Sequence, residues 1–269
     1  MKLAKVLTIA GSDSGGGAGI QADIKTITAL GGYATTVVTA ITAQNTNGVF
    51  GIHEVPTGFI AEQLDLVLSD IGADIIKTGM LFSAQIIETI CYILENYPAI
   101  PIVVDPVMLA KGGRTLLQDE AQDALQKLLL PRTFLLTPNI QEAEILANIK
   151  ITNIYDMKNA GSKIQSMGPN AVLIKGGHLD GGNLVCDVLA FGDNFEVFES
   201  PRIDTKNTHG TGCTLSSAIA CNLAKGLSLI ESIRQARLYV LGAIKNALEI
   251  GHGHGPLNHM WNMGTHKID

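Results

Sequence analysis

Short apolar runs alternate with longer amphipathic segments along almost the whole chain, and this alternation restricts the fold more than any other feature of the sequence. Most of the apolar runs are continuous, which is typical of strands that are covered on both faces of a parallel sheet. Between amphipathic segments, such strands predict repeated βα units and an α/β fold. The expected strands are residues 4–10, 34–40, 74–78, 101–105, 133–137 and 171–175.

Helical periodicity and turn residues fix the remaining elements. Gly31 and Gly32 end the first expected helix and Gly226 ends the sixth, as C-caps commonly do. Segments 184–191 and 195–198 flank a Gly-Asp-Asn turn and predict an antiparallel hairpin at a sheet edge. The expected helices are residues 18–30, 59–69, 84–97, 120–130, 154–167, 214–225 and 227–248.

The stretch from residue 26 to 50 carries no charge, but glycines interrupt it and Thr, Asn and Gln are frequent, so it predicts a buried strand followed by a loop. The tail from Gly251 onward is expected to be irregular. No linker and no repeat divides the chain. We therefore expect one three-layer α/β/α domain over residues 1–269, with a largely parallel central sheet and a small antiparallel edge.

The charge balance excludes several classes of function. The 269 residues include 19 Lys and Arg and 25 Asp and Glu, for a formal net charge of −6, with no basic run. Binding to nucleic acid or to a membrane is therefore not expected. Four cysteines without a CxxC pair predict reduced thiols, and the first apolar run is too short for a signal peptide. These features favour a cytoplasmic protein with a small ligand.

A glycine-rich segment, GSDSGGGAG at residues 11–19, follows the first expected strand. Gly17, Gly19 and Ala22 satisfy the GxGxxG/A spacing of a dinucleotide site, but the acidic ribose partner is missing, because no acid lies between Asp23 and Glu54. No Gly-Lys-Ser or Gly-Lys-Thr follows, which argues against a P-loop. A close approach to some ligand and a tight turn without one both remain open.

A second cluster, NTHGTGC at residues 207–213, precedes an apolar helix. Gly210, Thr211 and Gly212 let successive amides point at one spot, and the helix dipole adds positive potential, so the segment predicts an anion hole for phosphate. A helix N-terminus lowers the pKa of a thiol, so Cys213 could accept a proton from a substrate hydroxyl. The alternative is that Cys213 packs as a small hydrophobe.

Eight segments in order resemble one family closely. They are GSDSGGGAGIQAD, ITAQNTNGV, KTGM, VVDPVMLAKGG, TPNIQEAE, LIKGGH, NTHGTGCT and GHGHGP, spread from Gly11 to Pro256. This pattern is similar to that of the hydroxymethylpyrimidine/phosphomethylpyrimidine kinases of thiamine biosynthesis. The resemblance implies a ribokinase-like fold, ATP and Mg²⁺ as cofactors, and a homodimer. It also implies two phosphorylations, which convert 4-amino-5-hydroxymethyl-2-methylpyrimidine to its monophosphate and then to its diphosphate.

The resemblance also assigns the substrate pocket. Sugar kinases of the wider superfamily have an Asp as general base, where this chain has Cys213, as the pyrimidine kinases and a related pyridoxal-kinase group do. The pyrimidine contact falls at Gln44, whose amide can donate and accept hydrogen bonds, although a polar residue at a strand end can also cap backbone. Further pocket residues are Gly11, Ala18, Asp23, Met80 and Val107. By themselves Met80 and Val107 also fit core packing, and a helical Asp such as Asp23 is more often solvated.

Four more residues are expected on the phosphate side. Asn139 and Glu142 resemble an NxxE-like motif that organises Mg²⁺ and triphosphate through water, but the same pair also fits a helix capping box. Asp105 ends a strand and could join the outer shell of the metal, and Lys175 could neutralise a phosphate. Both could equally be solvated strand-end charges.

Two other functions remain as alternatives. A pyridoxal kinase of the same fold, or an enzyme with both activities, would act on a ring with a similar hydroxymethyl group, whereas Gln44 favours the pyrimidine. A catalytically silent sensor would keep the pocket, but the intact anion hole and Cys213 argue against it. His252, His254 and His259 lack a Cys or carboxylate partner in sequence, and no metal is assigned to them.

Overall fold

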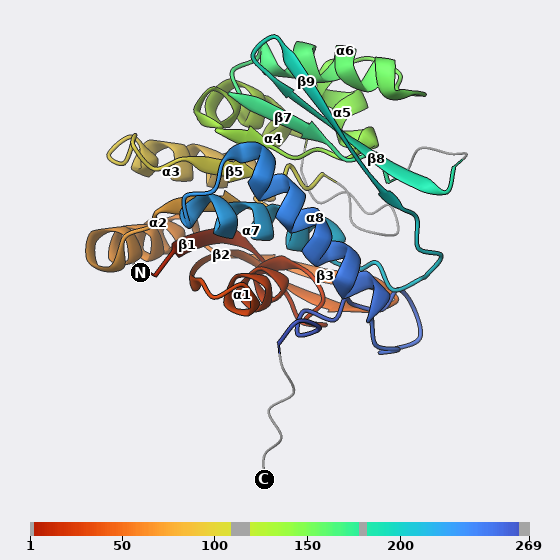
Figure 1. Ribbon diagram of the computed structural model, residues 1–269. Coiled ribbons are helices and arrows are strands. Elements are labelled where there is room, and N and C mark those ends of the chain that lie inside the picture. Colours follow the sequence, from red (N-terminus) through yellow and green to blue (C-terminus); the bar gives the residue numbers. More distant parts are fainter. Residues whose placement is uncertain (1–2, 109–118, 178–181, 264–269) are drawn as a thin grey trace.

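The computed structural model describes residues 3–108, 119–177 and 182–263 (Figure 1). In these parts of the chain, one sheet has the strand order β3-β2-β1-β4-β5-β6-β7-β8-β9. The pairs from β2 through β1 and β4 to β7 are parallel, and β3, β8 and β9 add antiparallel strands at the two edges. The strands are β1 (Lys5–Asp13), β2 (Tyr33–Asn45), β3 (Gly48–Glu54), β4 (Ile75–Thr78), β5 (Ile102–Val104), β6 (Leu135–Leu136), β7 (Ala171–Ile174), β8 (Leu184–Phe191) and β9 (Asn194–Pro201).

Helices cover both faces of this sheet. Neighbouring strand residues pack on opposite faces: Leu7 and Val104 join the core beneath α2 to α6, while Val6 and Val103 join the core beneath α1, α7 and α8. Figure 1 shows α7 and α8 lying across one side of the sheet. The helices are α1 (Gly19–Ala29), α2 (Thr57–Leu66), α3 (Ala84–Leu94), α4 (Asp119–Ala124), α5 (Ile140–Ala147), α6 (Ile154–Gln165), α7 (Thr211–Ala224) and α8 (Leu229–Lys245).

The predicted three-layer α/β/α architecture with a largely parallel sheet is confirmed, and so is the hairpin of β8 and β9. Gly31 and Gly226 adopt the positive φ of helix C-caps. The loop expected before residue 50 is wrong, because β2 continues to Asn45 and turns back into β3. The single-domain boundaries 1–269 stay a prediction. The last residues of the VVDPVMLAKGG segment and His178 lie outside the described residues.

The connections from β1 mark where a ligand can bind. Helix α1 links β1 to β2 on one face, and α2 leads to β4, on the other side of β1, across the opposite face. The order in which strands are added to the sheet therefore changes sides between β1 and β4. Parallel sheets bind ligands beyond the carboxyl ends of their strands at such a point. No helix among the described residues is long and apolar enough to cross a membrane.

Candidate active site

A cavity of about 680 Å³ lies at the carboxyl ends of β1, β4, β5 and β7, beside the N-terminus of α7. Both glycine segments line it, so the structure favours a ligand over an empty tight turn at the first of them. Of the predicted site residues, all but Asp23 lie along this cavity. They are Gly11, Ala18, Gln44, Met80, Val107, Asp105, Asn139, Glu142, Lys175, Gly210, Thr211, Gly212 and Cys213.

The residues of the predicted anion hole lie at the N-terminus of α7. Gly210 is its N-cap with a φ of 82°, and a Cβ there would lie 1.8 Å from the carbonyl oxygen of Gly17. Only glycine fits such a contact, which holds the two glycine segments together. A Cβ on Gly212 would lie 3.3 Å from Lys175 Nζ, so the first turn of α7 faces that ammonium group. The first amides of a helix have no partner within it and can bind an anion.

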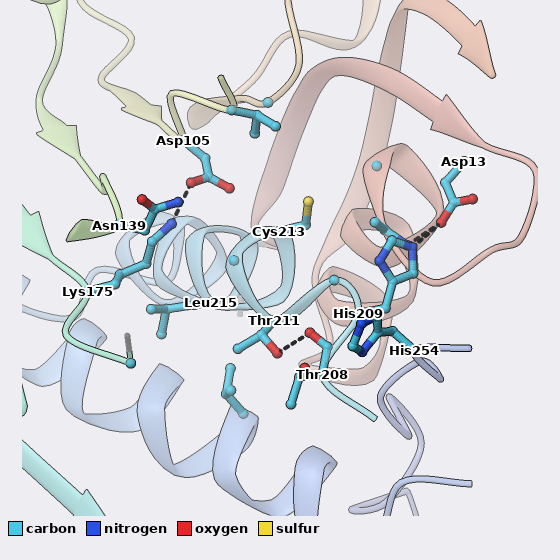
Figure 2. A pocket seen from close by; sticks show the side chains of 18 of the residues that line it. Asp13, Asp105, Asn139, Lys175, Thr208, His209, Thr211, Cys213, Leu215 and His254 are labelled. Carbon is cyan, nitrogen blue, oxygen red and sulfur yellow. Dashed lines mark hydrogen bonds and ion pairs between the residues drawn. The ribbon is translucent and has the colours of Figure 1, made fainter. Parts of the chain in front are cut away.

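Cys213 is half-buried at this helix end. Figure 2 shows its thiol between the group of Asp105, Asn139 and Lys175 and the pair of Asp13 and His209. Burial raises the pKa of the thiol to about 11, and the positive charge of Lys77 offsets this only in part. The predicted lowering of this pKa is therefore wrong for the ligand-free protein. Loss of hydration outweighs the charge of Lys77 and the amide of Gly19, and the thiol is protonated at neutral pH.

Lys175 and Asp105 meet across the sheet end (Figure 2). Lys175 Nζ donates to Asp105 Oδ1 at 2.8 Å, and Thr137 Oγ1 donates to the same oxygen at 3.3 Å. Burial alone would lower the pKa of Lys175, but the charges of Asp105 and Glu142 raise it. The two strand-end charges are thus partners in a half-enclosed site and not separately solvated groups.

Asn139 and Glu142 form a capping box at the start of α5. Asn139 Oδ1 accepts from the amide of Glu142 at 2.9 Å, and Glu142 Oε2 accepts from the amide of Asn139 at 2.8 Å. Burial raises the pKa of Glu142 to about 7, with Lys175 opposing and the charge of Asp105 adding to the rise. The capping alternative is confirmed, yet both side chains still line the cavity, so capping and ligand binding are compatible.

The other end of the cavity is more apolar. Met80 packs with Ala40 and Val107, and a Cβ on Gly11 would lie 2.4 Å from Met80 Cε. The side chain of Gln44 contacts Thr42 Oγ1 and His209 Nε2, both at 3.2 Å. It is therefore held by other side chains at the cavity wall, whereas the backbone of Gln44 bonds to Ser14 Oγ.

The placement of Asp23 in the substrate pocket is wrong. Its carboxylate is fully buried and accepts from Lys77 Nζ at 2.9 Å, from Thr8 Oγ1 at 2.5 Å and from Ser217 Oγ at 2.6 Å. A helical carboxylate with these partners is part of the core below the cavity. Sequence reasoning had treated it as an exposed or ligand-facing residue, because its Lys77 partner is distant in the chain.

Sequence reasoning missed Asp13, His209 and Lys77, which also line the cavity. Asp13 Oδ2 accepts from His209 Nε2 at 2.8 Å (Figure 2), and amides of the glycine loop donate to the same carboxylate. Burial would raise the pKa of Asp13, but these bonds lower it. All three residues belong to segments of the resemblance, which was the available signal. Arg237, which pairs with Asp187 along the same cavity, lies outside these segments, and no sequence signal pointed to it.

A cation would find suitable ligands beside Lys175. Asp105 and Glu142 are carboxylates close enough to repel each other electrostatically, and such hard oxygen ligands suit Mg²⁺. Within the described ranges, no cluster of three or more His, Cys, Asp and Glu side chains could hold a metal. A bound Mg²⁺ would therefore complete its shell with water and phosphate oxygens, as this ion commonly does.

Comparisons with known proteins agree with this geometry. A family model described as phosphomethylpyrimidine kinase matches residues 13–258. The hydroxymethylpyrimidine/phosphomethylpyrimidine kinase of Bacillus subtilis is 46% identical over 259 residues, which are 96% of each chain. A thiamine biosynthesis bifunctional protein of Geobacter sulfurreducens is 54% identical over 255 residues, 95% of this chain and 52% of that protein. The chain thus spans about half of the second relative and nearly all of the first.

Solved structures give the same fold. The phosphomethylpyrimidine kinase of Clostridium difficile has a TM-score of 0.80 at 45% identity, covering 90% of this chain and 99% of that one. The pyridoxal kinase of Staphylococcus aureus, in complex with AMP-PCP and pyridoxal, has a TM-score of 0.89 at 36% identity, covering 97% of this chain and 95% of that one. With its ribokinase-like fold, this chain belongs to the phosphomethylpyrimidine kinase family.

Proposed function

We propose that the cavity places 4-amino-5-hydroxymethyl-2-methylpyrimidine next to the triphosphate of ATP and transfers phosphate in two steps. The first step phosphorylates the hydroxymethyl oxygen, and the second adds a phosphate to the monophosphate. One observation carries this proposal: the N-terminus of α7, with Cys213, lies between the pair of Asp13 and His209 and the group of Asp105, Asn139 and Lys175 (Figure 2).

The apolar end suits the ring. Met80 and Val107 offer apolar contacts, and Gly11 lets Met80 pack closely against the backbone, because a Cβ on Gly11 would lie 2.4 Å from Met80 Cε. Gln44 adds a side-chain amide at the edge of this space. An amide that both donates and accepts matches the ring nitrogen and amino group of an aminopyrimidine.

The charged end suits the nucleotide. The amides at the start of α7 and the ammonium group of Lys175 would stabilise the charge on the transferring phosphoryl group. Asp105 and Glu142 would hold Mg²⁺ through its waters, and the ion would supply charge neutralisation at the phosphate oxygens. The position of Asn139 beside them supports the same assignment (Figure 2).

Cys213 is the proposed proton acceptor in the first step. The alcohol must lose its proton as it attacks phosphorus, and the thiol faces the junction of the two ends of the cavity. Since the free thiol is protonated at neutral pH, the thiolate must form after substrates bind, with Lys77 and the helix N-terminus stabilising it. The homodimer and the cytoplasmic location stay predictions.

An ATP-consumption assay tests the function. Purified protein with Mg²⁺ and ATP should phosphorylate the pyrimidine alcohol and, in a separate assay, its monophosphate. Pyridoxal is the third substrate, because the Staphylococcus aureus structure with pyridoxal has a similar fold. Turnover of pyridoxal alone would contradict the proposal and favour the pyridoxal-kinase alternative. Turnover of all three substrates would identify a dual-specificity enzyme.

A further inference from the structure

We infer that His209, held by Asp13, fixes the orientation of the Gln44 amide and so selects the hydrogen-bonding edge of the ring that the cavity accepts. The inference deepens the proposed function, on which it rests. His209 comes from the loop before α7, Asp13 from the end of β1 and Gln44 from the end of β2. Three distant parts of the chain thus meet at one side-chain amide.

Asp13 acts only as an acceptor in this group. Its Oδ1 accepts from the amide of Gly15 at 2.8 Å, and its Oδ2 accepts from the amides of Gly17 at 3.0 Å and Ala18 at 2.8 Å. These amides and His209 stabilise the carboxylate, which is ionised at neutral pH. The ring nitrogen of His209 that lies 2.8 Å from Asp13 Oδ2 must therefore carry a proton.

The same ring nitrogen determines one end of the Gln44 amide. His209 Nε2 lies 3.2 Å from the atom placed as Gln44 Nε2, but it carries an N–H whether the imidazole is neutral or charged. Two N–H groups cannot bond to each other, so the oxygen of the amide must face His209. The nitrogen and oxygen of a glutamine amide have the same shape, and their hydrogen-bond partners decide which is which.

Thr42 determines which atom lies at the other end of the Gln44 amide, and it requires the same orientation. Its hydroxyl donates to the backbone carbonyl of Ser12 at 2.8 Å, which uses its one hydrogen. The Thr42 oxygen also lies 3.2 Å from the atom placed as Gln44 Oε1. With its hydrogen used, Thr42 can only accept there, so the nitrogen and oxygen of the amide must exchange places. The Gln44 nitrogen must therefore donate to Thr42. Two independent contacts require one orientation of the amide.

The ring of His209 is itself held in place by backbone. A Cβ on Gly17 would lie 2.5 Å from His209 Cδ2 and 3.1 Å from Pro256 Cβ, so the ring packs where only glycine fits. The amide of His209 donates to the carbonyl of Gly255 at 3.1 Å. Gly255 and Pro256, at the end of the GHGHGP segment, therefore help to fix the histidine that orients Gln44.

A fixed amide presents a fixed order of groups to the ring. With its outer contacts used by His209 and Thr42, Gln44 offers one N–H and one oxygen lone pair side by side. A ring acceptor beside an exocyclic amino group matches this edge, as in glutamine recognition of adenine. A 4-oxo pyrimidine has the inverse order, a ring N–H beside a carbonyl, and would leave two unsatisfied pairs.

The test compares the 4-amino substrate with its 4-oxo analogue, 5-hydroxymethyl-2-methylpyrimidin-4(3H)-one. The wild-type protein should prefer the amino ring in kcat/KM by about 100-fold or more, since a site built for hydrogen bonds rejects a mismatched edge strongly. In His209→Ala the Gln44 amide keeps only one of the two contacts that fix it, so this preference should fall at least about tenfold. His209→Gln keeps an N–H donor and should retain most of the preference.

Further measurements distinguish a role in orienting the Gln44 amide from a general loss of structure. If His209→Ala lowers kcat/KM equally for both rings, His209 is only structural and the inference is overturned. His252→Ala removes an exposed histidine of the same tail and should leave the preference unchanged. Nitrogen NMR of the ligand-free protein should show a protonated Nε2 on His209, and an unprotonated Nε2 also overturns the inference. If wild-type protein phosphorylates neither ring, the proposed function is wrong, and calorimetric Kd values then give the same ratio.

Discussion

The thiol of Cys213 is subject to two opposed effects. Burial raises its pKa to about 11, while Lys77 and the start of α7 favour the thiolate. In the free protein, burial dominates. The thiol must therefore lose its proton to solvent after the substrates bind, before it can accept the proton of the alcohol.

This makes the two phosphorylations separable through Cys213→Ser. The first step has a neutral alcohol as nucleophile, so losing a general base should reduce it by about 10²–10⁴-fold. The second step has a phosphate monoester, largely ionised at neutral pH because its second pKa is near 6. We therefore expect a much smaller loss in that step, measured separately with purified monophosphate.

The control for this prediction is the anion hole, which Cys213→Ser leaves intact. The amides from Gly210 onward and Lys175 remain to bind the transferring phosphate. Equal losses in the two steps would mean that Cys213 positions substrate or shapes the anion hole. The general-base assignment would then be withdrawn.

Glu142 gives a second prediction at the residue scale, this time on stability. Its pKa is raised from an ordinary 4.5 to about 7, so the folded state binds its proton more tightly than the unfolded chain does. The stabilisation this provides is complete below about pH 4.5 and is lost as pH rises through 7. Glu142→Gln should therefore flatten the fall in the free energy of unfolding between pH 5 and 7.

Urea unfolding of the ligand-free protein at several pH values, for wild type and Glu142→Gln, checks this. Glutamine can still accept from the amide of Asn139, so most of the capping box survives. Adding Mg²⁺ at pH 7 should stabilise the wild type more than the variant. Parallel pH profiles for the two proteins would show that the Glu142 carboxyl is not perturbed as described.

At the scale of elements, the sequence predicts the buried parallel strands well because their apolar runs are short and continuous. β3 was missed because Gly48 and Gly51 interrupt it and its side chains are only partly covered, so no alternation marks it. The strand β6 is only Leu135–Leu136, shorter than the run that predicted it. Whether a segment becomes an edge strand, and how long a strand is, depends on the strand it pairs with. A local sequence pattern does not show that partner.

The site residues also divide into those that the sequence predicts and those that it does not. Asp105 and Lys175 were predictable, since charged residues after buried parallel strands gather at one sheet edge. The bonds of Asp13 to His209 and of Asp23 to Lys77 join residues 196 and 54 positions apart, and no spacing rule relates them. The lowered pKa expected for Cys213 failed for a related reason: burial depends on the whole pocket and not on the helix end alone.

The start of α7 carries a prediction about one glycine. Gly210→Ala would place a Cβ 1.8 Å from the carbonyl oxygen of Gly17, at a φ of 82°. Gly226 is the matched control, because its φ is 87° but no atom lies within 4 Å of an added Cβ. Gly226→Ala should cost about 1–2 kcal/mol for the left-handed backbone alone. Gly210→Ala should cost about 1–3 kcal/mol more from the clash.

Thermal or urea unfolding of both variants measures the difference, and kinase activity should fall only in Gly210→Ala. If the two substitutions destabilise the protein equally, the two glycine segments are not in the close contact described here. That result would also argue against the proposed anion hole, because its geometry depends on this contact.

At the scale of the whole molecule, one buried ion pair joins the elements around the cavity. Lys77 from β4 and Asp23 from α1 are both fully buried, and Thr8 of β1 and Ser217 of α7 donate to the same carboxylate. Four elements from the two sides of the switch point between β1 and β4 therefore share one charge cluster. Its position just below Cys213 couples the packing of the core to the electrostatics of the site.

This pair predicts a strong departure from additivity. Lys77→Met leaves the Asp23 carboxylate buried without a cation, which should cost about 3–5 kcal/mol in the free energy of unfolding. Lys77→Met with Asp23→Asn removes both charges, and the new amide can still bond to the hydroxyls of Thr8 and Ser217. The double variant should therefore be more stable than Lys77→Met alone, although it carries one more substitution. Urea unfolding of the wild type, both single variants and the double variant measures this coupling as a double-mutant cycle. If the double variant loses the sum of the two single losses, the residues act independently, and the cluster is not the joint that holds these four elements together.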